Sequence, residues 1–192
     1  MRRLLNIVLY LFAAIGLAGS IGAGYVYLEG RRAEEQLDPR APRVYGEFAR
    51  RMIAGDAASA SVLRLPLAEG VTVKEAIASM EARAGTRNMK SLGRFKLTLP
   101  EKGGTQRHAE VLHFCDSGTA LALLEYNPDF LAYMPCSIGL YADTEGRAWL
   151  VTMNLDLLIH GGREIDPELK QRVIAVKEGL LDIMAAGAAG AL

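Results

Sequence analysis

The sequence predicts an α+β domain in which helices cover one face of an antiparallel sheet. Three observations lead to this class: short strand-like runs joined by hairpin turns, helical segments between these runs, and a long amphipathic helix at the end. The expected order is β-α-β-β-α-β-β-α, and such an order is typical of α+β domains. One transmembrane helix is expected before the domain. We therefore divide the chain into an anchor or signal segment (1–30), a juxtamembrane linker with a short helix (31–57) and the α+β domain (58–192).

The N-terminal segment is long and apolar enough to predict a membrane helix. Leu4–Leu28 is interrupted only by Asn6 and Ser20, and about twenty apolar residues in a helix cross a bilayer core. Two interpretations remain open: an uncleaved anchor, or a cleavable signal peptide that releases a secreted domain. We favour the anchor because the apolar run continues to Leu28. The arginines at positions 2 and 3 are expected to stay in the cytoplasm, which places the domain in the periplasm on a single inner-membrane span.

Five runs predict strands because apolar and polar residues alternate in them and turn residues separate them. The clearest alternation is Phe95–Leu99, after which Pro100 turns the chain. The turn Asp143–Gly146 is expected to join the last two strands as a hairpin. The expected strands are Ser61–Leu67, Phe95–Leu99, Arg107–Cys115, Cys136–Ala142 and Arg147–Asn154.

Helix starts are signalled by capping residues. Thr72 and Glu75 form a capping box, in which each side chain satisfies a free backbone N–H at the helix start. Asp166 followed by Pro167 begins the last helix, whose apolar residues recur at helical spacing. The expected helices are Val44–Met52 ended by Gly55, Val73 to a stop at Gly85, Ser117–Leu124 capped by Asp116 or Ser117, one further turn within Asp129–Met134, and Pro167 to Ile183 or beyond.

Composition and missing motifs exclude several classes of function. Lys and Arg together number 22, Asp and Glu also number 22, and the isoelectric point is about 6.8. Nucleic-acid binders normally carry a basic excess, so no nucleic-acid partner is expected. The sequence has no P-loop, no GxGxxG and no CxxCH motif, which excludes covalent c-type haem and leaves the cofactor unknown.

Residues 109–162 hold the candidate site because they contain both cysteines. Cys115 and Cys136 lie at strand ends that flank one expected helix, and they are the candidate catalytic residues. Three interpretations remain open: a disulfide or redox-active pair, a ligand or metal site, and two inert buried thiols. The sequence does not decide whether the protein is an enzyme.

A metal site would need ligands beyond the two cysteines. His160 and His113 are the further candidates, with Asp156 as an alternative, because thiolate and imidazole suit zinc or copper. His113 lies two residues before Cys115 and therefore on the same strand face. No closely spaced cysteine pair typical of a zinc motif is present.

The polar segment after the last strand is a candidate ligand-binding loop. Asn154, Asp156 and His160 precede Gly161-Gly162. In one interpretation they bind a ligand together with Cys115 and Cys136, and the loop presents the imidazole. In the other, the glycines only turn the chain and His160 is exposed to solvent.

Two motifs resemble a known bacterial family. FCDSGTA (114–120) and MPCSIGLYADTEGRAWLVTMN (134–154) are similar to the family called domain of unknown function 302, in which a cysteine closes one strand and Pro-Cys opens the next. The resemblance covers roughly Ala58 to the C-terminus. NMKSLG (88–93) and DLLIHGG (156–162) resemble its membrane-anchored or exported branch.

The resemblance implies a compact α+β fold, often a homodimer, with no established reaction. Cys115, Pro135 and Cys136 match the family pattern. Ser137 and Ile138 stand where many relatives have an arginine-led pair, so no anion-binding arginine is carried over to this position.

The leading hypothesis is a membrane-anchored periplasmic binding or accessory module. Its small-ligand, metal or redox site would lie near Cys115, Cys136 and His160, and the thiols suggest sulfur or redox metabolism. One alternative is a thiol-dependent redox enzyme. Another is a structural subunit of a membrane complex, docked through small residues of the span such as Ala18 and Gly22 and through the Ala/Gly-rich C-terminal tail (185–192). The expected partners are the membrane, through Leu4–Leu28, and a second copy or a membrane-complex protein.

Overall fold

The computed structural model describes residues 2–34, 36–100 and 106–191, and its centre is an antiparallel five-stranded sheet. The strand order is β1-β5-β4-β3-β2, and all neighbouring strands are antiparallel. The strands are β1 (Val62–Pro66), β2 (Lys90–Pro100), β3 (Gln106–Cys115), β4 (Cys136–Ala142) and β5 (Ala148–Met153). The predicted α+β class and the existence of all five predicted strands are confirmed, but β2 begins at Lys90 and not at the predicted Phe95.

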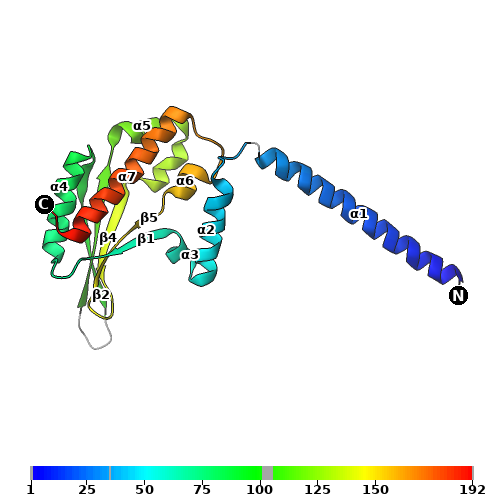
Figure 1. Cartoon of the computed structure of the whole chain (residues 1–192), viewed down its shortest axis with the longest axis horizontal. Coiled ribbons are helices and arrows are strands. Elements are labelled where there is room, and N and C mark those ends of the chain that lie inside the picture. Colours follow the sequence, from blue (N-terminus) through cyan, green and yellow to red (C-terminus); the bar gives the residue numbers. More distant parts are fainter. Residues whose placement is uncertain (1, 35, 101–105, 192) are drawn as a thin grey trace.

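The helices lie mainly on one face of this sheet. Figure 1 shows α7 beside α4 across the sheet, with α5 and α6 near the other end of α7, while α1 extends away from the domain. The helices are α1 (Arg2–Glu34), α2 (Ala41–Ala54), α3 (Ala57–Ala60), α4 (Val73–Thr86), α5 (Ser117–Tyr126), the 3-10 helix η1 (Pro128–Tyr133), α6 (Asp156–His160) and α7 (Pro167–Ala189).

The core forms between the sheet and helices α4 and α7. Alternate residues of β3, β4 and β5 face the helices and are fully buried, because side chains of a strand point to opposite faces in turn. The Ala/Gly-rich C-terminal tail belongs to this core as the last turns of α7. A Cβ at Gly187 would lie 2.4 Å from Met80 Cγ, so the missing side chain lets α7 approach α4 closely. The inward strand residues are Leu112, Phe114, Ile138, Leu140 and Leu150.

The predicted capping signals are confirmed, but one predicted helix end is wrong. Thr72 and Glu75 form the capping box of α4, and Asp166 accepts hydrogen bonds from the backbone N–H groups of Glu168 and Leu169. Helix α4 does not stop at Gly85. It continues to Thr86, and Asn88 takes the left-handed conformation (φ 55°) that turns the chain into β2. Asparagine tolerates this conformation better than most residues, so glycine was not required.

The predicted transmembrane segment Leu4–Leu28 falls within α1. Among the helical residues that the structure describes, no helix has both the length and the apolar character needed to cross a membrane. The membrane-spanning part of the fold prediction is therefore not confirmed.

Candidate ligand pocket

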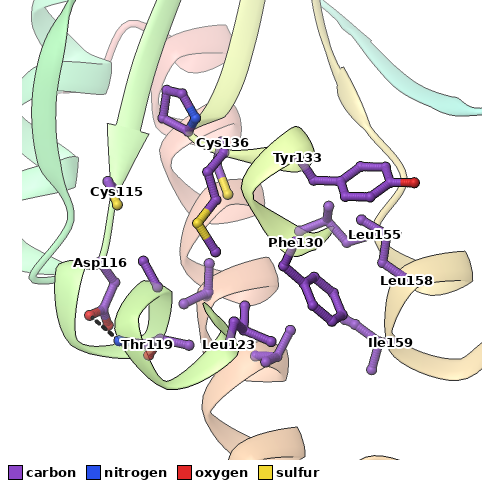
Figure 2. Close-up of a pocket in the computed structure, with 15 residues that line it drawn as sticks. Cys115, Asp116, Thr119, Leu123, Phe130, Tyr133, Cys136, Leu155, Leu158 and Ile159 are labelled. Atoms are coloured by element: carbon purple, nitrogen blue, oxygen red, sulfur yellow. Dashed lines mark hydrogen bonds between the residues drawn. The ribbon is translucent and has the colours of Figure 1, made fainter. Parts of the chain in front are cut away.

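An apolar cavity of about 60 Å³ lies where the chain leaves β3 and enters β4. Helix α5 and η1 close one side of it, and α6 and α7 close the other (Figure 2). Fifteen residues line the cavity: Cys115, Asp116, Thr119, Ala120, Leu123, Phe130, Tyr133, Met134, Pro135, Cys136, Leu155, Leu158, Ile159, Val173 and Val176.

Local capping interactions explain why the chain encloses this cavity. Asp116 ends β3 and caps α5, because its Oδ1 accepts hydrogen bonds from the N–H groups of Gly118 (3.0 Å) and Thr119 (3.1 Å). Asn127 Oδ1 accepts from Asp129 N at 2.9 Å and so begins η1. The inserted helices fold back over the ends of the two strands.

The structure brings the two predicted cysteines to one cavity as free thiols. Burial raises the pKa of Cys115, and the charge of Asp116 raises it further. Burial, together with the neighbouring Cys115, raises the pKa of Cys136 to about 11. Both groups are therefore protonated at neutral pH, and a protonated thiol is a weak nucleophile and a weak metal ligand.

His160 does not reach this cavity, and both interpretations of its environment are wrong. It lies in α6 rather than in a loop, and it is neither presented to a ligand nor exposed, since only 3% of its surface is accessible. Its Nδ1 lies 3.0 Å from Asp38 Oδ2, and Lys170 Nζ lies 2.6 Å from the same oxygen. His160 therefore belongs to a buried ion cluster.

The other predicted site residues also have local partners outside the cavity. His113 Nδ1 lies 2.9 Å from Ser137 Oγ on the neighbouring strand. Asn154 Oδ1 accepts a hydrogen bond from Asp156 N at 3.1 Å, and the Asp156 carboxylate is paired with Lys177. Neither Asn154 nor Asp156 lines the cysteine cavity.

The metal candidates are not assembled into a site. In the described ranges, no three His, Cys, Asp or Glu side chains come close enough together to hold a metal ion. Cys115 and Cys136 share a cavity, but His113 and His160 are bound elsewhere, to Ser137 and Asp38.

Sequence reasoning missed two groups of residues. The first is the wall of the cavity, especially Phe130, Leu155 and Leu158, which looked like ordinary apolar residues of short segments. The second is the pair Asp38 and Lys170, which complete the His160 cluster from positions more than 100 residues apart. The Asp38-Pro39 dipeptide signalled a turn, but it carried no information about a distant partner.

Comparison with known proteins identifies the domain. Residues 65–187 match the family model described as "Domain of unknown function DUF302". A crystal structure of an uncharacterized conserved DUF302 protein from Bacillus stearothermophilus has a similar fold, with a TM-score of 0.50 at 16% sequence identity. The similarity covers 65% of this chain and 96% of that one. None of the curated protein sequences matches. With its α+β domain matched by the family model over most of its length, the chain belongs to the DUF302 family.

Proposed function

We propose that this protein is a membrane-anchored periplasmic binding module that holds a small apolar molecule in the cavity beside Cys115 and Cys136. The observation that carries the proposal is the cavity wall, which consists almost entirely of aliphatic, aromatic and sulfur-containing side chains. Two polar residues contribute, Asp116 and Thr119, and the Asp116 carboxylate is engaged as the cap of α5, where it accepts from the backbone N–H groups of Gly118 and Thr119. A cavity of this kind offers water few partners and favours an apolar ligand.

The size of the cavity limits what it holds. One water needs roughly 10–15 Å³ of such volume, so about 60 Å³ has room for an aromatic ring or the end of a hydrocarbon chain. The exposed aromatic and aliphatic side chains of α5 and η1 next to the cavity, including Tyr126, Leu131 and Tyr133, provide an apolar route of entry.

The thiol-dependent redox enzyme is less well supported. Such an enzyme needs a thiolate, whereas the pKa of both cysteines is raised and that of Cys136 lies near 11. The surroundings of the thiols therefore suit packing against a ligand better than attack on a substrate.

The location is proposed on the basis of the sequence. The apolar run Leu4–Leu28 and the arginines before it support an inner-membrane anchor with the domain in the periplasm, as in an exported branch of the family. Association with a second copy or with a membrane-complex protein is also a prediction from the sequence. Cell fractionation, alkaline extraction and the intact mass of the mature chain test the anchor. An extractable chain that lacks its first residues would favour the secreted form.

The cavity is tested with Ala120→Phe, which fills it, and Ala122→Phe, a matched change in α5 outside the lining. Toluene is the probe, and the full chain is studied in a maltoside detergent. At about ten times its Kd, toluene should stabilise the wild type and Ala122→Phe by about 1.4 kcal/mol, which raises the melting temperature by roughly 3–5 °C. Ala120→Phe should show no such shift. Equal shifts in both variants, or none in the wild type, would refute the proposal.

A further inference from the structure

The sheet face opposite the core helices carries a second and larger hollow, of about 310 Å³. Val111, Gly139 and Val151 are cross-strand partners on β3, β4 and β5 and form its floor. A Cβ at Gly139 would lie 3.0 Å from Val151 Cγ1, so the missing side chain keeps the floor open. Met153 also lines the hollow and is 44% exposed. The hollow is therefore apolar and accessible from solvent.

The hollow and the cysteine cavity meet at Cys136. Four residues line both spaces: Tyr133, Pro135, Cys136 and Leu155. The cavity has about 60 Å³ of free volume and the hollow about 310 Å³, so the hollow is roughly five times larger. An occupant that places its apolar end in the cavity and continues past Cys136 into the hollow must be long and narrow.

The polar side chains of the hollow already have partners within the protein. Each of the three hydroxyls that line it donates to a backbone carbonyl oxygen: Ser61 to Ala57 at 2.7 Å, Ser137 to Pro135 at 3.2 Å, and Thr152 to Ser137 at 2.8 Å. Among the residues that the structure describes, no charged side chain lines the hollow. A charged group placed there would lose water without gaining a charged partner, which is unfavourable.

The basic side chains beside the hollow are engaged as well. Arg64 on β1 donates to Ser59 Oγ at 3.2 Å and is attracted to the Asp56 carboxylate. His113 Nδ1 lies 2.9 Å from Ser137 Oγ. Neither basic residue marks a place for an ionic headgroup, so the surroundings of the hollow favour an uncharged, apolar occupant.

We propose that the cysteine cavity and the hollow together bind one linear hydrocarbon chain of a lipid, which is recognised by its length and not by its headgroup. The apolar end occupies the cavity, so the inference rests on the proposed function. The following methylene groups pass Cys136 and lie along Val111, Gly139 and Val151, and the headgroup stays in solvent. A second copy fits this face less well, because two facing hollows would leave unfilled space, whereas protein interfaces pack as densely as protein interiors.

Photolabelling of the full chain tests this proposal. The protein is kept in cholate, a steroid detergent that has no linear chain to compete for the site. Two hexadecanol probes carry a diazirine, one at the end of the chain and one at its middle. The end-labelled probe should react with α5 and η1, and the mid-chain probe should react with β4 and β5. Mass spectrometry that locates each adduct to a residue distinguishes the two.

Variants that fill the hollow should block the mid-chain reaction. Val151→Trp fills it, whereas Tyr141→Trp is a matched change on the same face of β4 that lies outside the lining. Each methylene that loses its apolar surroundings weakens binding roughly fourfold. Because the new ring displaces several methylenes, Val151→Trp should lower sheet labelling by about tenfold or more, and Tyr141→Trp should not change it. Val111→Phe, on the other side of the floor, should act as Val151→Trp does.

The headgroup should not affect the reaction. A fatty acid with its diazirine at the middle of the chain should label the sheet as strongly as the alcohol of the same length, and a strong preference for either would overturn recognition by the chain. Unlabelled hexadecanol and phosphatidylcholine as competitors distinguish a single-chain lipid from a phospholipid.

Failure of this inference can be distinguished from failure of the proposed function. The toluene shift, measured in the same detergent, should persist in Val151→Trp and shows that the fold and the cysteine cavity are intact. Mid-chain labelling confined to α5 and η1, or sheet labelling that survives both hollow-filling variants, would overturn the chain and leave the cavity as a site. Loss of the toluene shift in the wild type would remove the cavity and this inference together. A dimer that Val151→Trp dissociates would show that a second copy covers the face instead.

Discussion

The short helix α6 separates two buried regions with opposite chemistry. On one side, Leu158 and Ile159 line the apolar cysteine cavity. On the other, His160 meets Asp38 and Lys170 in a cluster where each charged group has a partner. The cavity has free volume and few polar groups. The ion cluster has polar groups, but they fill their site by binding one another. Burial of a reactive residue type is therefore a weak sign of function unless space accompanies it.

The ion cluster attaches the segment after α1 to the domain. Asp38 N donates to the Gly162 carbonyl oxygen (3.0 Å), and the Tyr45 hydroxyl donates to the Gly161 carbonyl oxygen (2.5 Å). Leu37 also forms an isolated β-bridge with Arg163. The backbone carbonyl groups of the two glycines after His160 thus bind the segment that follows α1, and the glycines are not part of a ligand-binding loop.

The largest expected effect is that of Asp38→Ala. The substitution leaves Lys170 and His160 without their shared carboxylate and removes the acceptor for Arg40 N. Breaking a buried ion pair by removing one partner destabilises by about 3–5 kcal/mol. Urea unfolding of the full chain measures this loss. Asp56→Ala, which removes the exposed N-cap of α3 and a surface attraction to Arg64, should cost about 1 kcal/mol and serves as the control. Equal losses would mean that the cluster is no stronger than a surface cap.

Acid should weaken the same cluster. Burial alone would raise the pKa of Asp38, but hydrogen bonds from Lys170, His160 and Arg40 N outweigh it and lower this pKa to about 2. A carboxyl with a depressed folded pKa stabilises above its unfolded value near 3.8, and this contribution is lost as the pH falls towards 2. The free-energy difference between wild type and Asp38→Asn should therefore shrink by about 2 kcal/mol between pH 5 and pH 2. A constant difference in urea unfolding would contradict the assignment.

The smallest expected effect is the difference in stability between two substitutions of Cys136 in the apolar cavity. Cys136→Ser places a hydroxyl among apolar side chains, whereas Cys136→Ala removes only the sulfur. An unpaired hydroxyl in such surroundings costs about 1–3 kcal/mol, so the Ala variant should be more stable than the Ser variant by about 1 kcal/mol. Thermal unfolding of both variants measures the difference. A Ser variant as stable as the Ala variant would show that the cavity satisfies polar groups.

Much of the fold was predictable because its signals are local. The capping box Thr72–Glu75 and the cap Asp166 depend on residues within one turn, and strand alternation needs only a few neighbours. Helices α3 and α6 were missed because four or five residues are too few to show a helical period. Gly85 was misread because glycine inside a helix and glycine after it look alike in sequence.

The candidate site was only partly predictable. Cys115 and Cys136 end and begin neighbouring strands, and that local placement was enough to bring them to one cavity. His160 was grouped with them because it is a reactive residue type near glycines. Its true partner, Asp38, lies 122 residues away, and no local pattern links the two.

The sequence by itself determined the order of the five strands and the longer helices of the domain, most of their approximate boundaries, the family motifs and the shared position of the two cysteines. These depend on hydrophobic period, caps and turns, which act over a few residues. Only the tertiary structure decided which buried groups have partners and where space remains. Packing of α6 between α2 and α7 closed the His160 cluster, while the fold of α5 and η1 over the strand ends left a cavity. Both outcomes depend on contacts between distant segments, and a one-dimensional pattern does not contain that information.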